Sequence, residues 1–307
     1  MKKLLSMLTT LAAAALVAGS ASVAFAQQDY KTPQAAIDAL VAAAESDDPK
    51  AALAVFGRDG EEIISSGDKV ADEAARKRFV ASYDAKHEIK MDGDRKATLV
   101  IGDNDYPFAV PLVRVKGMWS FDTQAGLYEI LYRRIGHNEL RAIQTCLAYV
   151  DAQNEYAERD RGAGAGVYAQ SIVSEPGKKD GLYWPTAAGE PESPLGEFFA
   201  KASQQGYKSG EGRAPYQGYY YKILTMQGPA APGGALNYVV NGKMIGGFAL
   251  VAYPAEYRNS GVMTFMVSHQ GAVFQKDLGP DTAAAEAITA YNPGNGWNEV
   301  KETASTK

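Results

Sequence analysis

Apolar residues recur at helical spacing in the region that follows residue 31. Thr32-Pro33 forms an N-cap and first-turn pair, and Ile37, Leu40, Val41 and Ala44 follow it on one face. Asp48-Pro49 begins a second short helix that ends before Gly57. A third amphipathic stretch covers residues 70–86. The pattern therefore predicts three helices at the start of the chain.

Strand-like stretches come next, at residues 97–101, 108–115 and 118–121. Lys116-Gly117 separates the last two and indicates a tight hairpin turn. Helices followed by an antiparallel meander predict an α+β domain. This order is similar to that of small domains of the cystatin or nuclear-transport-factor type, a likeness of fold alone.

The second half opens with helical patterns. Residues 124–134 predict a bridging helix that is broken at Gly136, and Asn138 predicts the N-cap of a long helix that ends near residue 159. Apolar residues at offsets of three and four place Cys146 on the buried face of this helix.

Glycines interrupt the pattern after the long helix, at Gly162, Gly164 and Gly166, and an irregular stretch then continues to Pro194. Residues 195–205 predict another helix. Strand patterns follow at residues 219–226, 238–240, 247–253, 262–268 and 272–277, with a turn at 269–271. We expect two α+β domains, each with helices packed on an antiparallel sheet, at residues 27–135 and 136–300, and a tail at 301–307.

Residues 1–26 predict a secretory leader. Lys2 and Lys3 precede a short apolar run, and Ala24-Phe25-Ala26 supplies a small-x-small cleavage pattern. We expect cleavage after Ala26, a periplasmic mature chain in a host with two membranes, and no transmembrane segment after removal of the leader.

The charge balance argues against polyanionic partners. The 31 basic residues fall to 29 without Lys2 and Lys3, against 36 acidic residues, so the mature net charge is about −7 with neutral histidines. Nucleic-acid binding depends on clustered cations that neutralise phosphates, and anionic membranes require a similar basic patch. A single cysteine also excludes an internal disulfide.

Motifs of established chemistry are absent from the sequence. His87, His137 and His269 are far apart and have no metal-ligand spacing. There is no Gly-x-Ser-x-Gly elbow and no glycine-rich phosphate loop. Cys146 is expected to be structural, because a reactive thiol needs access and a nearby positive charge. The sequence predicts no catalytic residue, no metal and no cofactor.

Two groups of residues are candidates for a site. Glu61, Glu62 and Asp68 form an acidic cluster, which either supplies a general acid/base pair or caps helices and turns. An aromatic group can line a platform for sugars or peptides, although tyrosines also favour a half-buried strand. Its members are Tyr183, Trp184, Tyr219, Tyr220 and Tyr221.

The second half resembles the globular head of type IV pilins and pseudopilins. The stretches that carry the resemblance are "NELRAIQTCLAYVDAQNEYAERD", "GLYWP", "GYYYKIL" and "GVMTFMVSHQGAVFQKD". The hydrophobic N-terminal helix that anchors pilins is missing. The resemblance implies a scaffold and not filament formation.

The mature chain as a whole resembles the bacterial family called domain of unknown function 2950. The motifs that carry this resemblance include "GRDGEEIISSGDKVAD", "YPFAVPLVRVKGMWSFD", "RRIGHNEL", "PGKKDGLYWP", "ESPLGEFF" and "NGKMIGGFALVAYPAEYRNSGVMTF". The resemblance implies no known reaction. We expect an exported, non-enzymatic binding or scaffolding module, whose partner is an unidentified envelope protein or glycan. The alternative is a periplasmic hydrolase that acts on cell-wall or carbohydrate material.

Overall fold

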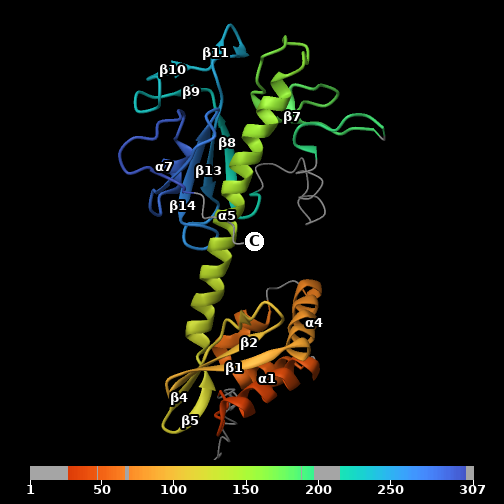
Figure 1. Cartoon of the computed structure of the whole chain (residues 1–307), viewed down its shortest axis with the longest axis vertical. Coiled ribbons are helices and arrows are strands. Elements are labelled where there is room, and N and C mark those ends of the chain that lie inside the picture. The colour runs from red at the N-terminus through yellow and green to blue at the C-terminus, as the bar shows by residue number, and fades with distance from the viewer. Residues whose placement is uncertain (1–26, 47, 66–68, 188, 197–214, 302–307) are drawn as a thin grey trace, which may run out of the picture. The chain divides into compact units, whose positions relative to one another are not determined.

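The structure is a computed structural model that describes residues 27–46, 48–65, 69–187, 189–196 and 215–301. The chain divides into two compact units between Tyr128 and Glu129. Unit 1 carries the red to yellow elements of Figure 1, and unit 2 the green to blue ones. The two units are described separately below.

Helices open unit 1. They are α1 (Pro33–Ser46), α2 (Pro49–Phe56), the 3-10 turn η1 (Arg58–Gly60), α3 (Glu61–Ile64) and α4 (Lys69–Ala85). The sequence predicted α1, α2 and α4 and missed η1 and α3. The hydroxyl of Thr32 accepts a hydrogen bond from the Ala35 N–H at 3.1 Å, and the Asp48 carboxylate accepts one from the Lys50 N–H at 2.9 Å. These side chains cap the first turns of α1 and α2, where backbone N–H groups have no intrahelical partner.

The sheet of unit 1 is antiparallel. Its strands are β1 (His87–Asp92), β2 (Lys96–Ile101), β3 (Tyr106–Pro107), β4 (Leu112–Val115) and β5 (Met118–Phe121), in the order β1-β2-β4-β5 with β3 beside β2. The sequence missed β1, which begins at His87, directly after the predicted helical stretch 70–86. The predicted strand at 108–115 is also shorter, because Pro111 has no N–H to donate to the ladder.

The core of unit 1 lies between the sheet and α1. Ile37 and Leu40 of α1 are buried with Trp119 and Phe121 of β5. A backbone bridge from Tyr30 to Trp119 joins the segment before α1 to the edge strand β5. The helix stripe that the sequence predicted therefore faces the sheet.

Unit 2 contains most of a single long helix, α5 (Thr123–Ala157), where the sequence predicted two. Gly136 does not break it, because a helical glycine costs only ~1 kcal/mol relative to alanine. The expected N-cap residues bond elsewhere. Asn138 Nδ2 donates to the Ser260 carbonyl at 2.9 Å, and Glu139 Oε1 accepts from the N–H groups of Val262 and Met263.

A five-stranded antiparallel sheet forms the body of unit 2, in the order β16-β15-β14-β13-β8. Its strands are β8 (Tyr219–Leu224), β13 (Ala249–Pro254), β14 (Met263–Ser268), β15 (Val273–Asp277) and β16 (Asn298–Glu299). Small ladders and one short helix complete the unit: β9 (Met226–Gln227) with β10 (Leu236–Asn237), β11 (Val239–Val240) with β12 (Lys243–Met244), and α7 (Thr282–Glu286).

The stretch between α5 and β8 contains a parallel strand pair that the sequence did not predict. β6 (Ser171–Val173) lies beside β7 (Gly181–Tyr183), so the segment expected to be an irregular aromatic loop begins as a strand. The Leu195 N–H then donates to the Leu182 carbonyl at 3.0 Å. Most of the helix predicted at 195–205 lies outside the described residues.

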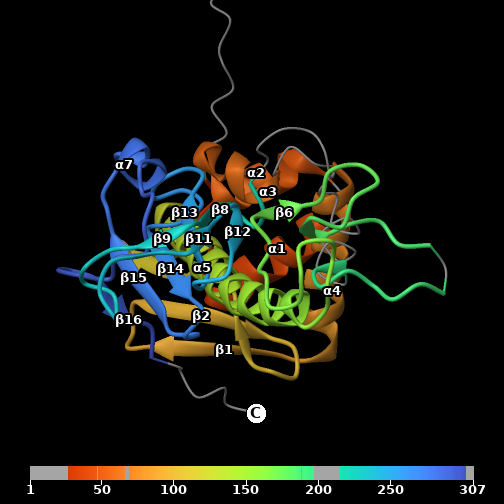
Figure 2. The same cartoon turned by 90° about the horizontal axis from the view of Figure 1, so that it is seen from above.

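Helix α5 packs against the sheet of unit 2. Both views place it beside β8 and β13 (Figures 1 and 2). Cys146 is fully buried there, as its position in the helical stripe predicts. Gln153 is also buried and bonds both the N–H and the carbonyl of Ala169, at 2.8 and 2.7 Å. Its amide also donates to the Tyr149 hydroxyl at 3.0 Å.

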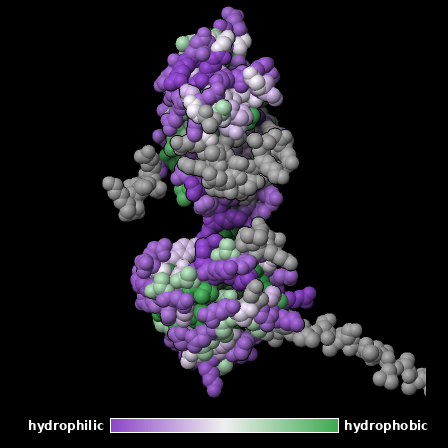
Figure 3. Space-filling view, turned by 90° about the vertical axis from the view of Figure 1, so that its right-hand side faces the viewer, coloured by the Kyte–Doolittle hydropathy of each residue, from purple (hydrophilic) through white to green (hydrophobic). Residues whose placement is uncertain are grey.

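The outer surface is polar. In the view of Figure 3 the visible faces of both units are mostly hydrophilic. Among the described residues, none of the helices is long and apolar enough to span a lipid bilayer. The predicted leader at 1–26 lies outside the described residues, so the structure does not test it.

Candidate functional site

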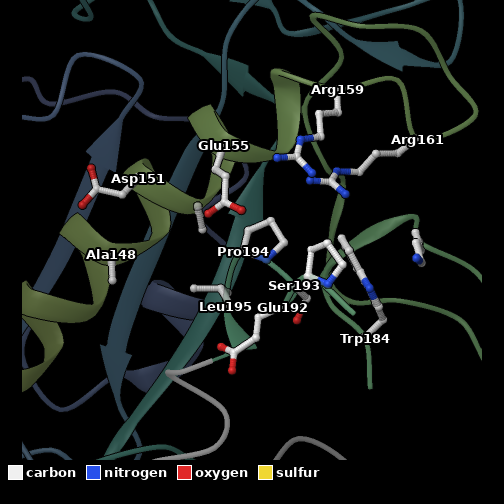
Figure 4. A pocket seen from close by; sticks show the side chains of 13 residues that line it. Ala148, Asp151, Glu155, Arg159, Arg161, Trp184, Glu192, Ser193, Pro194 and Leu195 are labelled. Atoms are coloured by element: carbon white, nitrogen blue, oxygen red, sulfur yellow. The ribbon is translucent and has the colours of Figure 1, made fainter. Parts of the chain in front are cut away.

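A cavity of about 600 Å³ lies in unit 2, beside the C-terminal turns of α5. We call it the Trp184 cavity, after the indole in its wall (Figure 4). Ligand pockets are commonly ~300–1,000 Å³ in volume, so this cavity is large enough for a small organic ligand.

One wall is a stripe of α5. Ala148, Ala152 and Glu155 succeed one another at offsets of three or four residues, with Asp151 beside them, and Arg159 follows shortly after the end of the helix. This spacing places side chains on one face of a helix. Ala152 is buried against the core, while Glu155 and Arg159 are exposed toward the open side.

The facing wall is formed by residues 179–184 and 191–195. The Tyr156 hydroxyl donates to the Lys179 carbonyl at 2.9 Å and fixes this segment to α5. Pro191 and Pro194 restrict the backbone of the second segment, because the proline ring fixes φ. The facing wall is therefore held in place by a tertiary hydrogen bond and by stiff backbone.

Arg161 lies between two aromatic rings at one end of the cavity. Its guanidinium carbon is 5.1 Å from the centre of the Tyr156 ring and 4.8 Å from that of Trp184. Its Nε also donates to the Tyr156 carbonyl at 3.3 Å. Loss of hydration lowers the pKa of Arg161, because burial disfavours the charged form. The rings compensate in part through cation–π attraction.

No carboxylate among the described residues lies within ion-pair distance of Arg159 or Arg161. In Figure 4 the two guanidinium groups approach each other. Lys179 adds a third positive charge, with its Nζ 5.7 Å from the centre of the Trp184 ring. A cluster of cations that form no ion pair with the described residues is a common feature of anion-binding sites.

Two polar side chains of the cavity wall lack hydrogen-bond partners. The Nε1 of Trp184 and the Oγ of Ser193 are both buried, and neither bonds to any described residue. A buried polar atom without a partner costs ~1–3 kcal/mol. A bound ligand or an ordered water can satisfy such groups.

Carboxylates also line the cavity. The carboxylates of Glu155 and Glu192 lie on the other side of the cavity from the two guanidinium groups (Figure 4). No group of three or more His, Cys, Asp or Glu side chains within the described part of the chain can hold a metal ion.

The structure places the predicted aromatic residues in different surroundings. Trp184 lines the cavity and is 5% exposed. Tyr219 is fully buried, and its hydroxyl donates to the Met263 carbonyl at 2.9 Å. Strand alternation places Tyr220 on the opposite face of β8 from Tyr219 and Tyr221, and the Tyr220 ring packs on Tyr253. Tyr183 and Tyr221 are half-buried beside the core. A ligand-binding role for this group stays a prediction.

The predicted acidic cluster is described only in part. Glu61 and Glu62 are exposed in the first turn of the short helix α3, and Asp68 lies outside the described residues.

Cys146 is enclosed by the core, and burial raises the pKa of its thiol to about 12. The thiol is therefore not activated.

Sequence reasoning found Trp184 but missed the charged residues around it. Arg159 and Arg161 were treated as the end of a helix and the start of a glycine-rich loop, and Glu192 as part of an irregular stretch. Two arginines beside a Gly-x-Gly-x-Gly segment were the available signal. Only the fold shows that residues 159–161 and 179–195 surround one cavity.

Comparison with known proteins identifies a family and no activity. A family model described as "Protein of unknown function (DUF2950)" matches residues 27–300. No curated protein and no solved structure matches the chain. The likenesses to pilin heads and to cystatin or nuclear-transport-factor domains therefore stay predictions.

Proposed function

The chain belongs to the DUF2950 family of proteins of unknown function, and we propose that it is a non-enzymatic binding module whose ligand site is the Trp184 cavity. The observation that carries this proposal is Arg161. This guanidinium is partly buried between two rings in the wall of a cavity, and no described carboxylate pairs with it. A desolvated cation without an anion is unfavourable unless a ligand compensates it.

The proposed setting is the bacterial envelope. The leader pattern of residues 1–26 supports export. The long helix laid on an antiparallel sheet supports a scaffold similar to a pilin head, and the helices and meander of unit 1 support a likeness to small cystatin-type domains. The ligand that we propose is a cell-wall component or the terminus of an envelope protein.

A hydrolase based on the acidic cluster has less support. Glu61 and Glu62 are exposed on a helix of one turn, where a carboxylate is ordinarily solvated. General acid catalysis at neutral pH needs a carboxyl group whose pKa is raised by burial or by a neighbouring anion. The Trp184 cavity supports binding directly.

The test is a titration of the full-length mature chain with soluble muropeptides, which carry both sugar and peptide groups. Ala148 lines the cavity on α5, and Ala148→Met adds side-chain volume there without loss of helix propensity. The matched control is Asn154→Met, at an exposed α5 position outside the cavity wall.

Calorimetry is expected to show binding to the wild type and to Asn154→Met, and binding at least ~10-fold weaker to Ala148→Met, a loss of ~1.4 kcal/mol. Equal affinity in all three proteins, or no binding to any of them, would contradict the proposal. Circular dichroism of each variant verifies that its helix content is unchanged.

A further inference from the structure

The charges that line the Trp184 cavity are balanced and separated. Three cationic side chains, those of Arg159, Arg161 and Lys179, share the wall with three carboxylates, those of Asp151, Glu155 and Glu192. Figure 4 shows both guanidinium groups on one side and the carboxylates of Glu155 and Glu192 on the other. The cavity therefore has a positive and a negative end.

At the positive end two like charges face each other. Burial lowers the pKa of Arg161 most, attraction by Tyr156 and Glu155 raises it, and repulsion by Arg159 lowers it by a smaller amount. A carboxylate between the two guanidinium groups would relieve this repulsion. It would also accept several N–H bonds in the planar geometry that favours arginine over lysine.

The negative end is formed by Glu155 and Glu192. No described cation lies within ion-pair distance of either carboxylate, although Glu155 attracts Arg161 at longer range. An ammonium group has donors for both carboxylates. Carboxylate oxygens accept such charge-assisted bonds at short distances.

We infer that the ligand of the Trp184 cavity is zwitterionic, with its carboxylate held by Arg159 and Arg161 and its ammonium group held by Glu155 and Glu192. This inference rests on the proposed function and names the ligand class. A free short peptide has this chemistry. An inorganic anion does not, because it would compensate one end of the cavity and be repelled by the other.

The probes are tri-alanine, N-acetyl-tri-alanine, tri-alanine amide, inorganic phosphate and neutral chitotriose, each titrated into the full-length mature chain. Removal of either charge from the tripeptide is expected to weaken binding about tenfold or more, since hydrogen bonds to charged groups are stronger than those between neutral groups. Binding of tri-alanine is also expected to weaken with added salt, because the cavity is partly open.

Paired variants locate each charge. In Arg159→Gln/Arg161→Gln the free peptide and its amide should bind equally, because both partners of the carboxylate are lost. In Glu155→Gln/Glu192→Gln the free peptide and its N-acetyl form should bind equally, because both partners of the ammonium group are lost. This is the logic of a double-mutant cycle. Arg141→Gln and Glu158→Gln are controls at exposed positions outside the cavity wall, and each should preserve both preferences.

The outcomes separate this inference from the proposed function. If chitotriose or muropeptides bind in a manner sensitive to Ala148→Met and tri-alanine does not bind, the binding function stands and the zwitterionic ligand is refuted. Phosphate that binds as tightly as tri-alanine, or affinity unaffected by acetylation and amidation, also refutes it. If Ala148→Met affects no probe and no muropeptide, both proposals fail.

Discussion

At the scale of single residues, buried polar groups distinguish the structural part of unit 2 from the candidate site. The Gln153 amide is fully buried and bonds to Tyr149 and Ala169, so α5 is tied to the chain that follows it. Trp184 and Ser193 are buried to a similar degree, and their polar side-chain atoms have no hydrogen-bond partner among the described residues. Satisfied groups contribute to stability, and the unsatisfied groups at the cavity are available to a ligand or to an ordered water.

Gln153→Leu is expected to lower the free energy of unfolding by ~2 kcal/mol or more, because the Ala169 N–H and carbonyl would remain buried without partners. Denaturant titration measures the change. Gln144→Leu, at an exposed position on the same helix, should alter it by less than ~0.5 kcal/mol. A similar effect in both variants would mean that the network contributes little.

Cys146 should be chemically inert in the folded protein. Its thiol is fully buried with its pKa raised to about 12, so the thiolate is scarce at neutral pH and the reagent has no access. A thiol reagent at pH 8 is expected to label the unfolded chain and leave the native chain unlabelled. Rapid native labelling would show that the helix face is accessible.

Cys146→Ala should cost roughly 1 kcal/mol of stability and leave ligand binding unchanged.

At the scale of elements, tertiary contacts decided the outcome where local signals were ambiguous. Gly136 and Asn138 predict the end of one helix and the start of another, yet α5 continues because Asn138 and Glu139 bond to the 260–263 segment. The edge strand β1 escaped prediction because it has only one half-buried residue, Ile89, among exposed ones. Helices with clear caps and the central strands β13 and β14 were predicted to within about two residues.

The two glycines of α5 give a matched test of its continuity. A Cβ at Gly136 would meet nothing within 4 Å, so Gly136→Ala should stabilise the protein by up to ~1 kcal/mol. A Cβ at Gly126 would lie 2.6 Å from Val110 Cγ2, so Gly126→Ala should destabilise it. Thermal unfolding compares the two. Destabilisation by Gly136→Ala would show that the helix is interrupted there.

At the scale of the whole molecule, the sequence predicted the α+β class and the family but only one part of the site. Trp184 is recognisable because it belongs to the aromatic group that the sequence shows. Its charged neighbours come from three separate segments, and no local pattern brings Arg161, Lys179 and Glu192 together. Spatial proximity of this kind follows from the packing of α5 and from the β6–β7 pair.

Export is a prediction about the whole chain that the described residues do not test. Protein taken from its native envelope is expected to begin at Gln27 or Gln28, because cleavage follows Ala26. Intact-mass spectrometry measures this. A chain that retains Met1 would contradict the predicted leader. It would not affect the proposal for the Trp184 cavity, which does not depend on export.

The central claim, that the Trp184 cavity is where this protein binds its ligand, is tested most directly by amide hydrogen exchange with and without soluble muropeptides. Binding slows exchange in the segments that a ligand orders. We expect added protection in residues 148–161 and 179–195, which line the cavity, and the same protection in Asn154→Met but not in Ala148→Met. Protection confined to other segments, or none at saturating ligand, would contradict the claim.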